Sequence, residues 1–197
     1  MRIKICGLFR PEDITYANEV RPDYIGFVFA RSKRRVSYDE AARLKKMLRP
    51  DIQAVGVFVD ASAGDIVRCL GSGMIDMVQL HGTESEADII QIRKHSGKKV
   101  IKAVKATSAQ DIIPWLESSA DYLLFDSGQG SGLTFNWQVL SDITREFFLA
   151  GGLAEANLLK ACQMVKPFAV DISSGAESAG IKDYDKMKKL TQIVRCQ

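Results

Sequence analysis

Residues 2–29, "RIKICGLFRPEDITYANEVRPDYIGFVF", contain the unit from which the fold is inferred. The two ends of this stretch, residues 2–7 and 24–29, are short runs rich in β-branched and aromatic residues, which is typical of strands. Between them, Pro11 is followed by two acidic residues, a signature of a helix start. A strand, a helix and a strand in this order predict parallel pairing, because a chain reaches a parallel partner only through a crossover connection.

The same strand–helix unit recurs along the chain. One helical segment opens with Ser37 and has Glu40 three residues later, which is the pattern of a capping box. Eight units at a fairly even spacing, with no long linker and no shift in composition, predict an α/β protein built as a single-domain (β/α)8 TIM barrel over residues 1–197. An open, doubly wound sheet would fit five or six units and is the alternative. The further strand runs are residues 54–59, 77–82, 99–105, 122–127, 147–152 and 168–173.

Composition and charge exclude several classes of protein. The 197 residues have a formal net charge of +3, which is too small to argue for binding to nucleic acid or to a membrane surface. The longest apolar runs are strand-sized and the first residues are charged throughout, so neither a membrane span nor a secretory leader is predicted. The four cysteines are scattered singly, without CxxC spacing, and are expected to be free thiols. We therefore expect a cytoplasmic protein that binds neither nucleic acid nor a membrane and is either a monomer or a homodimer.

Cys6 lies where the first strand ends, and in a barrel the working residues lie at the C-terminal ends of the strands and point inward. Side chains alternate along a strand, so Cys6 shares a face with Lys4. One interpretation makes Cys6 a nucleophile or base whose pKa, about 8.5 when free, is lowered by the charge of Lys4. The other makes it a small buried apolar side chain. We also expect Lys4 to pair with Asp171, because strands one and eight are neighbours in a closed barrel and an inward lysine needs a partner.

Asp126 and His81 end two further strands. Asp126 follows a run of apolar and aromatic residues, and desolvation at a partly apolar barrel mouth would raise its pKa. A raised pKa suits a general acid near neutral pH, whereas the structural alternative is an aspartate that bonds to the backbone of the next turn. His81 shares a face with Gln79 and is either a hydrogen-bonded residue of the barrel mouth or a catalytic group. His95 is expected on a helix surface.

Two glycine-rich turns follow the last two strands. Backbone N–H groups in such turns and at helix N-termini bind phosphate, and barrels often carry a phosphate site on the loops after strands seven and eight. A basic run over residues 30–36 follows the second strand and is either a solvated loop or a recognition element for carboxylate or phosphate. No His, Asp or Glu cluster has metal-ligand spacing, and no Walker-type loop is present. The predicted phosphate-binding residues are Gly151, Gly152, Ser173, Ser174 and Gly175.

In these motifs the chain resembles the phosphoribosylanthranilate isomerase family of tryptophan biosynthesis. The stretches that carry the resemblance run in order over nearly the whole chain: "KICGL", "GFVF…SKRRV", "VGVFV", "VQLHG", "LLFDS…GSGLTFNW", "AGGL" and "PFAVDISSGAE…GIKD". The resemblance implies an Amadori rearrangement without cofactor or metal. In that reaction the aminal of N-(5-phosphoribosyl)anthranilate opens and the sugar becomes 1-(o-carboxyphenylamino)-1-deoxyribulose 5-phosphate.

The resemblance also implies a role for individual residues. Asp126 would be the general acid that protonates the ribose ring oxygen, and Cys6 the general base that removes the C2 proton. Arg34 would hold the anthranilate carboxylate, and the two glycine-rich loops would take the 5-phosphate. We also count His81 and Asp171 among the substrate-binding residues.

The chain departs from the family pattern at four positions. After Asp126 the loop is short, and Gln129, Ser131 and Asn136 replace a glycine, a threonine and an aspartate; Ala176 stands where valine is common. Three other functions stay open. A dual-substrate sugar isomerase would have an aspartate in place of Cys6, and a pentose-phosphate epimerase would need metal-binding histidines. A metabolite-binding barrel without catalysis would need the phosphate loops but no acid–base pair.

Overall fold

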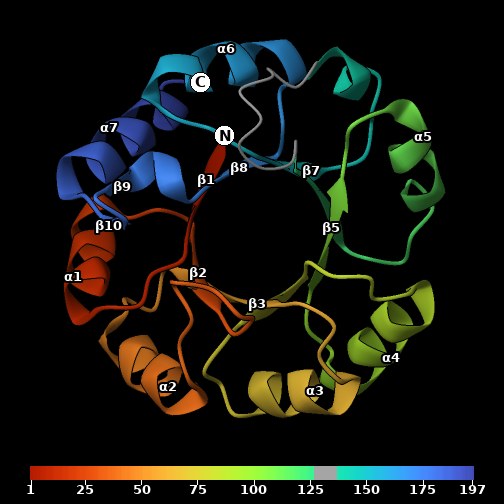
Figure 1. Cartoon of the computed structure of the whole chain (residues 1–197), viewed down its shortest axis with the longest axis horizontal. Coiled ribbons are helices and arrows are strands. Elements are labelled where there is room, and N and C mark those ends of the chain that lie inside the picture. Colours follow the sequence, from red (N-terminus) through yellow and green to blue (C-terminus); the bar gives the residue numbers. More distant parts are fainter. Residues whose placement is uncertain (127–136) are drawn as a thin grey trace.

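A computed structural model describes residues 1–126 and 137–197. Eight parallel strands form one closed barrel in the order of the chain, and the helices form an outer ring around it (Figure 1). The first and last strands pair directly, with Lys4 opposite Asp171, so the predicted (β/α)8 barrel is confirmed and the open sheet is wrong. The strands are β1 (Arg2–Cys6), β2 (Tyr24–Val28), β3 (Gln53–Phe58), β4 (Met77–Leu80), β5 (Val100–Lys105), β6 (Tyr122–Asp126), β7 (Phe147–Ala150) and β8 (Ala169–Ile172).

Capping residues set the starts of several helices. The backbone N–H of Glu40 donates to Ser37 Oγ at 3.2 Å, and the backbone N–H of Ser37 donates to Glu40 Oε2 at 2.7 Å, which confirms the predicted capping box. Pro11 begins the first helix, as predicted. No helix in the described part of the chain is long and apolar enough to cross a membrane. The α-helices are α1 (Pro11–Val20), α2 (Tyr38–Met47), α3 (Ala63–Gly71), α4 (Glu86–Ser96), α5 (Ala109–Ile112), α6 (Glu155–Val165) and α7 (Tyr184–Arg195).

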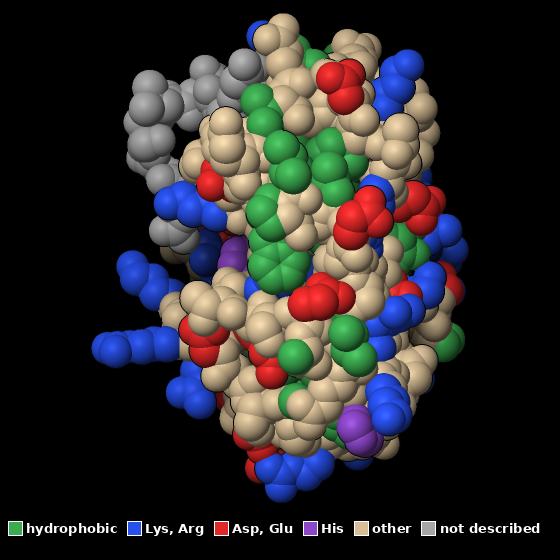
Figure 2. Space-filling view, turned by 90° about the vertical axis from the view of Figure 1, so that its right-hand side faces the viewer, with side chains coloured by type: hydrophobic (Ala, Val, Ile, Leu, Met, Phe, Trp, Pro, Cys, Tyr) green, Lys and Arg blue, Asp and Glu red, His purple; other side chains and the backbone are tan. Residues whose placement is uncertain are grey.

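The fifth and sixth units differ from the even alternation that the sequence predicts. Helix α5 is a single turn that continues into a 3-10 helix, η1 (Ile113–Trp115). Pro114 in η1 has no backbone N–H to donate, which favours the end of a regular helix there. In the described residues after β6, the sixth unit contains the 3-10 helix η2 (Trp137–Leu140). Figure 2 faces this side of the molecule and shows hydrophobic side chains gathered on its surface; the apolar residues lining a pocket there include Ile113, Leu116, Val139 and Ile143.

Alternate side chains of the strands fill the barrel interior. Three aromatic rings pack edge to face there, with the Phe148 centroid 5.5 Å from those of Tyr24 and Tyr122. The other strand face packs against the helices in a second and larger apolar layer. Asp126 alternates with the inward-facing Tyr122 and Leu124, so its side chain lies on the inner face at the C-terminal end of β6. The apolar interior consists of Tyr24, Val55, Met77, Ile101, Ala103, Tyr122, Leu124, Phe148, Ala150 and Ala169.

The N-terminal end of the barrel uses one arrangement three times, which we call the aspartate clamps. An aspartate directly before β2, β4 and β6 accepts the backbone N–H from the start of the preceding strand, at 2.7–2.9 Å. The same carboxylate also forms an ion pair with a basic residue of a helix in the outer ring. Each clamp thereby joins two adjacent strands to a helix. The clamps are Asp23 with Ile3 and Arg195, Asp76 with Ala54 and Lys45, and Asp121 with Val100 and Arg93.

The segment after β8 contains more structure than the predicted loop with a short extra helix. The short helix is present as the 3-10 helix η3 (Ser174–Ala176). It is followed by a hairpin of two antiparallel two-residue strands, β9 (Glu177–Ser178) and β10 (Ile181–Lys182). Their register places Glu177 opposite Lys182. The unpredicted hairpin therefore brings an acidic and a basic side chain together close to the end of β8.

Candidate active site

Cys6 ends β1 with a side chain that is almost completely buried. Its partner across the ladder is Gly26 of β2, and a Cβ atom at Gly26 would lie 2.6 Å from Cys6 Sγ. That distance is far shorter than two such atoms tolerate. The space that the thiol occupies thus depends on a glycine in the neighbouring strand.

Lys4 and Asp171 form a buried ion pair beneath the thiol. Lys4 Nζ lies 2.7 Å from Asp171 Oδ2, and the Lys4 side chain has no exposed surface, so the predicted pairing is confirmed. Burial disfavours the charged ammonium, but Asp171 and Cys6 outweigh burial and the pKa of Lys4 is raised. The second oxygen, Asp171 Oδ1, is buried without a hydrogen-bond partner in the described part of the molecule.

The predicted direction of the Cys6 pKa is wrong in this structure. Burial raises the pKa of the Cys6 thiol, the charge of Lys4 lowers it and the charge of Asp171 raises it again, and the net shift is upward. Lys4 therefore acts in the predicted direction but is outweighed by burial, and the pairing with Asp171 offsets part of its charge. The free protein holds Cys6 as a thiol over a wider pH range than an exposed cysteine.

Asp126 lies next to His81 at the barrel mouth. Asp126 Oδ2 is 3.5 Å from His81 Nε2, and both side chains are partly exposed. On its other side His81 Nδ1 lies 2.8 Å from the amide nitrogen of Gln79, which is buried. With the Gln79 amide donating, Nδ1 accepts and the ring proton resides on Nε2, facing Asp126. The rise in the Asp126 pKa that the sequence suggests stays a prediction.

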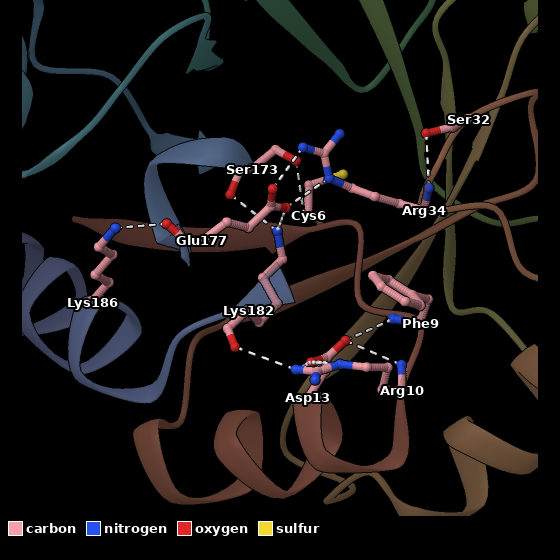
Figure 3. Close-up of polar contacts among 10 residues, drawn as sticks. All are labelled: Cys6, Phe9, Arg10, Asp13, Ser32, Arg34, Ser173, Glu177, Lys182 and Lys186. Carbon is pink, nitrogen blue, oxygen red and sulfur yellow. Dashed lines mark hydrogen bonds and ion pairs between the residues drawn. The ribbon is translucent and has the colours of Figure 1, made fainter. Parts of the chain in front are cut away.

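Arg34, in the basic run after β2, is held by the hairpin that follows β8. Its Nε and Nη2 atoms donate to Glu177 Oε1 and Oε2 at 2.6 and 2.7 Å (Figure 3). Lys182 Nζ donates to Glu177 Oε1 at 2.5 Å and to the backbone oxygen of Ser173 at 3.0 Å. Burial works against the Glu177 carboxylate, but its bonds to Arg34 and Lys182 prevail and lower its pKa.

The other basic residues of this run are exposed. The interpretation as a solvated loop therefore fits these residues, whereas the interpretation as a recognition element fits Arg34. Arg31, Lys33 and Arg35 are exposed, whereas Arg34 is partly buried. The stem of Arg34 passes over Gly7, and a Cβ atom at Gly7 would collide with Arg34 Cδ. Gly7 also has a φ of +82°, a conformation that favours glycine. The glycine after Cys6 thus allows the chain to turn and Arg34 to lie beside the thiol.

The two glycine-rich loops lie against each other. Gly175, after β8, packs directly on the backbone oxygen of Leu153, after β7. Ser173 Oγ donates to the backbone oxygen of Cys6 at 3.1 Å, which joins the loop after β8 to the end of β1. Helix α6 begins directly after the loop that contains Gly151 and Gly152. Turn N–H groups and a helix N-terminus therefore lie together, as the phosphate hypothesis requires.

A comparison with known proteins assigns the family. Residues 3–193 match the family model described as N-(5'phosphoribosyl)anthranilate (PRA) isomerase. The chain belongs to the PRA isomerase family. A PRA isomerase of Endomicrobium trichonymphae is 41% identical over 199 residues, which is 98% of each chain. As a member of this family the chain is an isomerase.

Solved structures of PRA isomerases have the same fold. The enzyme of Thermotoga maritima is 35% identical, with complete coverage of both chains and a TM-score of 0.91. A PRA isomerase in complex with reduced 1-(o-carboxyphenylamino)-1-deoxyribulose 5-phosphate is 34% identical, with complete coverage of both chains and a TM-score of 0.89. A further Thermotoga maritima structure is described as monomers generated from a dimeric enzyme; it is 34% identical, with complete coverage of both chains and a TM-score of 0.88.

The departures from the PRA isomerase pattern fall in two places. Gln129, Ser131 and Asn136 lie outside the described residues. Ala176 is fully buried at the end of η3, where the loop after β8 meets the hairpin. Within residues 1–126 and 137–197 no group of three or more His, Cys, Asp or Glu side chains is arranged to hold a metal ion.

Sequence reasoning missed four residues of this PRA isomerase site. Gly26 had a detectable signal, because a glycine inside a strand marks a close approach. Glu177 and Lys182 flank an Ala–Gly turn, a weak hairpin signal next to the glycine-rich stretch. Gln79 shares a face with His81, but its bond to the imidazole depends on side-chain geometry that the sequence does not specify.

Proposed function

We propose that this chain catalyses the rearrangement of N-(5'-phosphoribosyl)anthranilate to 1-(o-carboxyphenylamino)-1-deoxyribulose 5-phosphate, a step of tryptophan biosynthesis, with Asp126 as general acid and Cys6 as general base. One observation carries the assignment of these roles. The two groups end strands β1 and β6, which lie three strands apart around one closed barrel, so they face the mouth from different walls. An acid and a base on different sides of a bound sugar suit a reaction that opens a ring and then moves a proton.

In the first step Asp126 gives its proton to the ribose ring oxygen. The bond between C1 and that oxygen breaks, and the nitrogen lone pair of the anthranilate forms the C1=N bond of an iminium ion. The resulting Asp126 carboxylate faces the His81 Nε2–H, which can donate toward it as negative charge develops. His81 is thereby proposed to stabilise the product of the first proton transfer.

In the second step the Cys6 thiolate removes the proton from C2. The electron pair of the C2–H bond forms a C1=C2 double bond, while the π pair of the C1=N bond returns to the nitrogen and neutralises the iminium. The resulting enolamine tautomerises to the C2 ketone as its hydroxyl proton leaves and a proton is added at C1. Burial raises the pKa of Cys6, so a nearby cation is needed to favour the thiolate. Lys4 supplies a fixed positive charge, and the iminium formed in the first step supplies a transient one.

Four groups are proposed to position the substrate. Arg34 binds the anthranilate carboxylate, for which a guanidinium has a matching shape. The loops after β7 and β8 take the 5-phosphate through backbone N–H groups. Asp171 Oδ1, buried and without a partner among the described residues, is proposed to accept a bond from a ribose hydroxyl. The crystallised relative with a bound 1-deoxyribulose 5-phosphate derivative supports a ligand of this class.

The test is a direct assay of turnover. Phosphoribosylanthranilate is generated in situ, and the loss of its fluorescence is followed with wild type, Cys6→Ser and Asp126→Asn. We expect rapid loss with wild type and rates lower by about 10²–10⁴-fold in each variant, the usual contribution of general acid–base catalysis. Equal thermal unfolding temperatures would show that the variants are folded. Folded wild type without turnover would refute the activity, and undiminished turnover by either variant would refute that residue's role.

A further inference from the structure

Arg34 presents a restricted set of hydrogen-bond donors. A guanidinium carries five N–H groups, and the edge formed by Nε and Nη2 is used for the bidentate contact with Glu177. The third nitrogen, Nη1, points away from Glu177 (Figure 3). Together with the second hydrogen of Nη2, it forms the end of the guanidinium that has no hydrogen bond to residues 1–126 or 137–197 and can bind a planar, bidentate acceptor.

Lys182 keeps this arrangement positively charged. Glu177 alone would neutralise Arg34, but Lys182 Nζ lies 2.5 Å from the same carboxylate, so the three groups together carry one net positive charge. The Glu177 and Lys182 side chains are 5% and 0% exposed, so little solvent screens this charge. A second carboxylate approaching Arg34 thus meets net attraction.

We propose that Glu177 and Lys182 are a positioning pair that aims the free end of Arg34 and thereby sets the preference for an N-aryl aminosugar with a carboxylate ortho to its nitrogen. This inference rests on the proposed function, in which Arg34 binds the anthranilate carboxylate. Three features position Arg34: Glu177 holds the edge of its guanidinium, Gly7 leaves room for its side-chain stem, and Ser32 Oγ accepts its backbone N–H at 3.1 Å. A fixed fork discriminates better than a mobile one, because less conformational freedom is lost on binding.

A purely structural role would not require these charges. A buried ion pair is a weak source of stability, and apolar residues of similar volume often serve as well or better. Here the Arg34–Glu177 ion pair joins the loop after β2 to the hairpin after β8, on the side of the barrel where Cys6 lies. The charged triad is therefore best explained by the ligand group that it faces.

The hairpin also offers a matched control. Lys186 Nζ donates at 2.6 Å to the backbone oxygen of Glu177, so it supports the same hairpin without touching the Glu177 carboxylate (Figure 3). A Lys186→Met variant removes one lysine from this network, as Lys182→Met does. Only Lys182→Met removes a positive charge that contacts the Glu177 carboxylate and thereby changes the net charge around Arg34.

The experiment compares two stable ligands by calorimetry: reduced 1-(o-carboxyphenylamino)-1-deoxyribulose 5-phosphate and the same compound without the carboxylate. For wild type we expect the carboxylated ligand to bind at least about tenfold more tightly, the value of one charge-assisted contact. Lys182→Met should remove most of this preference because the net charge falls to zero. Glu177→Gln should remove most of it because the edge of the Arg34 guanidinium is released, although the net charge rises; both variants should leave the affinity for the second ligand unchanged. In turnover, both variants should raise KM more than they lower kcat. Lys186→Met should keep the wild-type preference.

Each other outcome has a defined meaning. If Glu177→Gln keeps the full preference while wild type turns over its substrate, the inference fails and the proposed function stands. Equal weakening of both ligands would show a structural role and would also overturn the inference. Lys182→Met makes the same test if Glu177→Gln does not fold. Wild type that neither turns over phosphoribosylanthranilate nor prefers the carboxylated ligand would refute the proposed function itself.

Discussion

The two ends of the barrel treat charged groups differently. At the N-terminal end the same aspartate clamp occurs three times, and each carboxylate has both a backbone donor and a basic partner. At the C-terminal end each charged arrangement differs from the others: Lys4 pairs with Asp171, Glu177 lies between Arg34 and Lys182, and Glu84 pairs with Lys102 while accepting two backbone N–H groups. The buried Asp171 Oδ1 and Gln79 Oε1 atoms at this end have no partner among the described residues. A repeated arrangement in which every polar group has a hydrogen-bond partner is typical of a structural role. Buried polar atoms at the C-terminal end that lack a partner indicate a ligand-binding role.

The two ends also differ in how deeply their charged groups are buried. A clamp carboxylate is partly exposed and loses little hydration. The Lys4–Asp171 pair at the other end is buried, and such a pair is a weak stabiliser by itself. The pair lies beside Cys6, where the charge of Lys4 lowers the pKa of the thiol and the charge of Asp171 raises it.

The largest effect on stability is expected from breaking the buried pair. Lys4→Met leaves the Asp171 carboxylate buried without its partner, and we expect the free energy of unfolding to fall by about 3–5 kcal/mol. Chemical denaturation measures this value. The double variant Lys4→Met with Asp171→Asn should recover much of the loss, because no charge is then buried unpaired. A single variant as stable as wild type would show that the pair is not desolvated.

A smaller loss is expected from crowding the thiol. Gly26→Ala places a methyl group against Cys6 Sγ, and overpacking of this kind costs about 1–3 kcal/mol. Because the thiol must move, turnover should fall as well. Gly64→Ala is the control, because only a flexible Ser62 oxygen comes near its new methyl group, at 3.9 Å. Unchanged turnover in Gly26→Ala would mean that the position of Cys6 is not critical.

Removing one clamp should affect stability without affecting catalysis. Asp121→Ala leaves the Val100 backbone N–H without its acceptor, and we expect a loss of about 1–2 kcal/mol in the free energy of unfolding. Turnover per folded molecule should be unchanged. The control is Asp142→Ala, which changes an exposed aspartate shortly after η2 and should have no effect on stability. A loss of turnover in folded Asp121→Ala would contradict the assignment of a structural role to the N-terminal end and of catalysis to the C-terminal end.

The smallest effect is a pH shift. Burial raises the pKa of Cys6, so the folded protein holds the thiol proton more tightly than the unfolded chain does. This contribution to stability is full below the ordinary thiol pKa and is lost as pH rises through the raised one. Alkylation of Cys6, followed by mass spectrometry, should begin at higher pH than for free cysteine. Asp171→Asn should move it to lower pH, because the charge of Asp171 raises the pKa of Cys6; a move to higher pH would contradict this electrostatic assignment.

Much of the fold could be predicted because the signals are local. The β-rich runs end within two residues of the observed strands, and Ser37 caps its helix as its spacing indicated. Closure of the barrel makes β1 and β8 neighbours, so the pairing of Lys4 with Asp171 was also predictable. The short α5 was not predicted, because a proline after one helical turn alters a pattern that otherwise favours a longer helix.

The site was only partly predictable because its geometry is not local. Cys6 and Asp126 were found as strand ends, but the net pKa direction at Cys6 depends on the balance between burial and Lys4. Arg34 was found by its motif, whereas the contact with Glu177 joins residues 143 positions apart. Such contacts are set by the packing of loops, which residue spacing does not encode.

The division between the two ends is tested most directly by one comparison of rates. Loss of phosphoribosylanthranilate fluorescence is measured for Asp126→Asn and Asp121→Ala at equal concentrations of folded protein. We expect the Asp126→Asn rate to fall by at least about 10²-fold and the Asp121→Ala rate to equal that of wild type. If Asp126→Asn keeps the wild-type rate, or if Asp121→Ala loses as much as Asp126→Asn does, the assignment of catalysis to the C-terminal end through Asp126 is wrong.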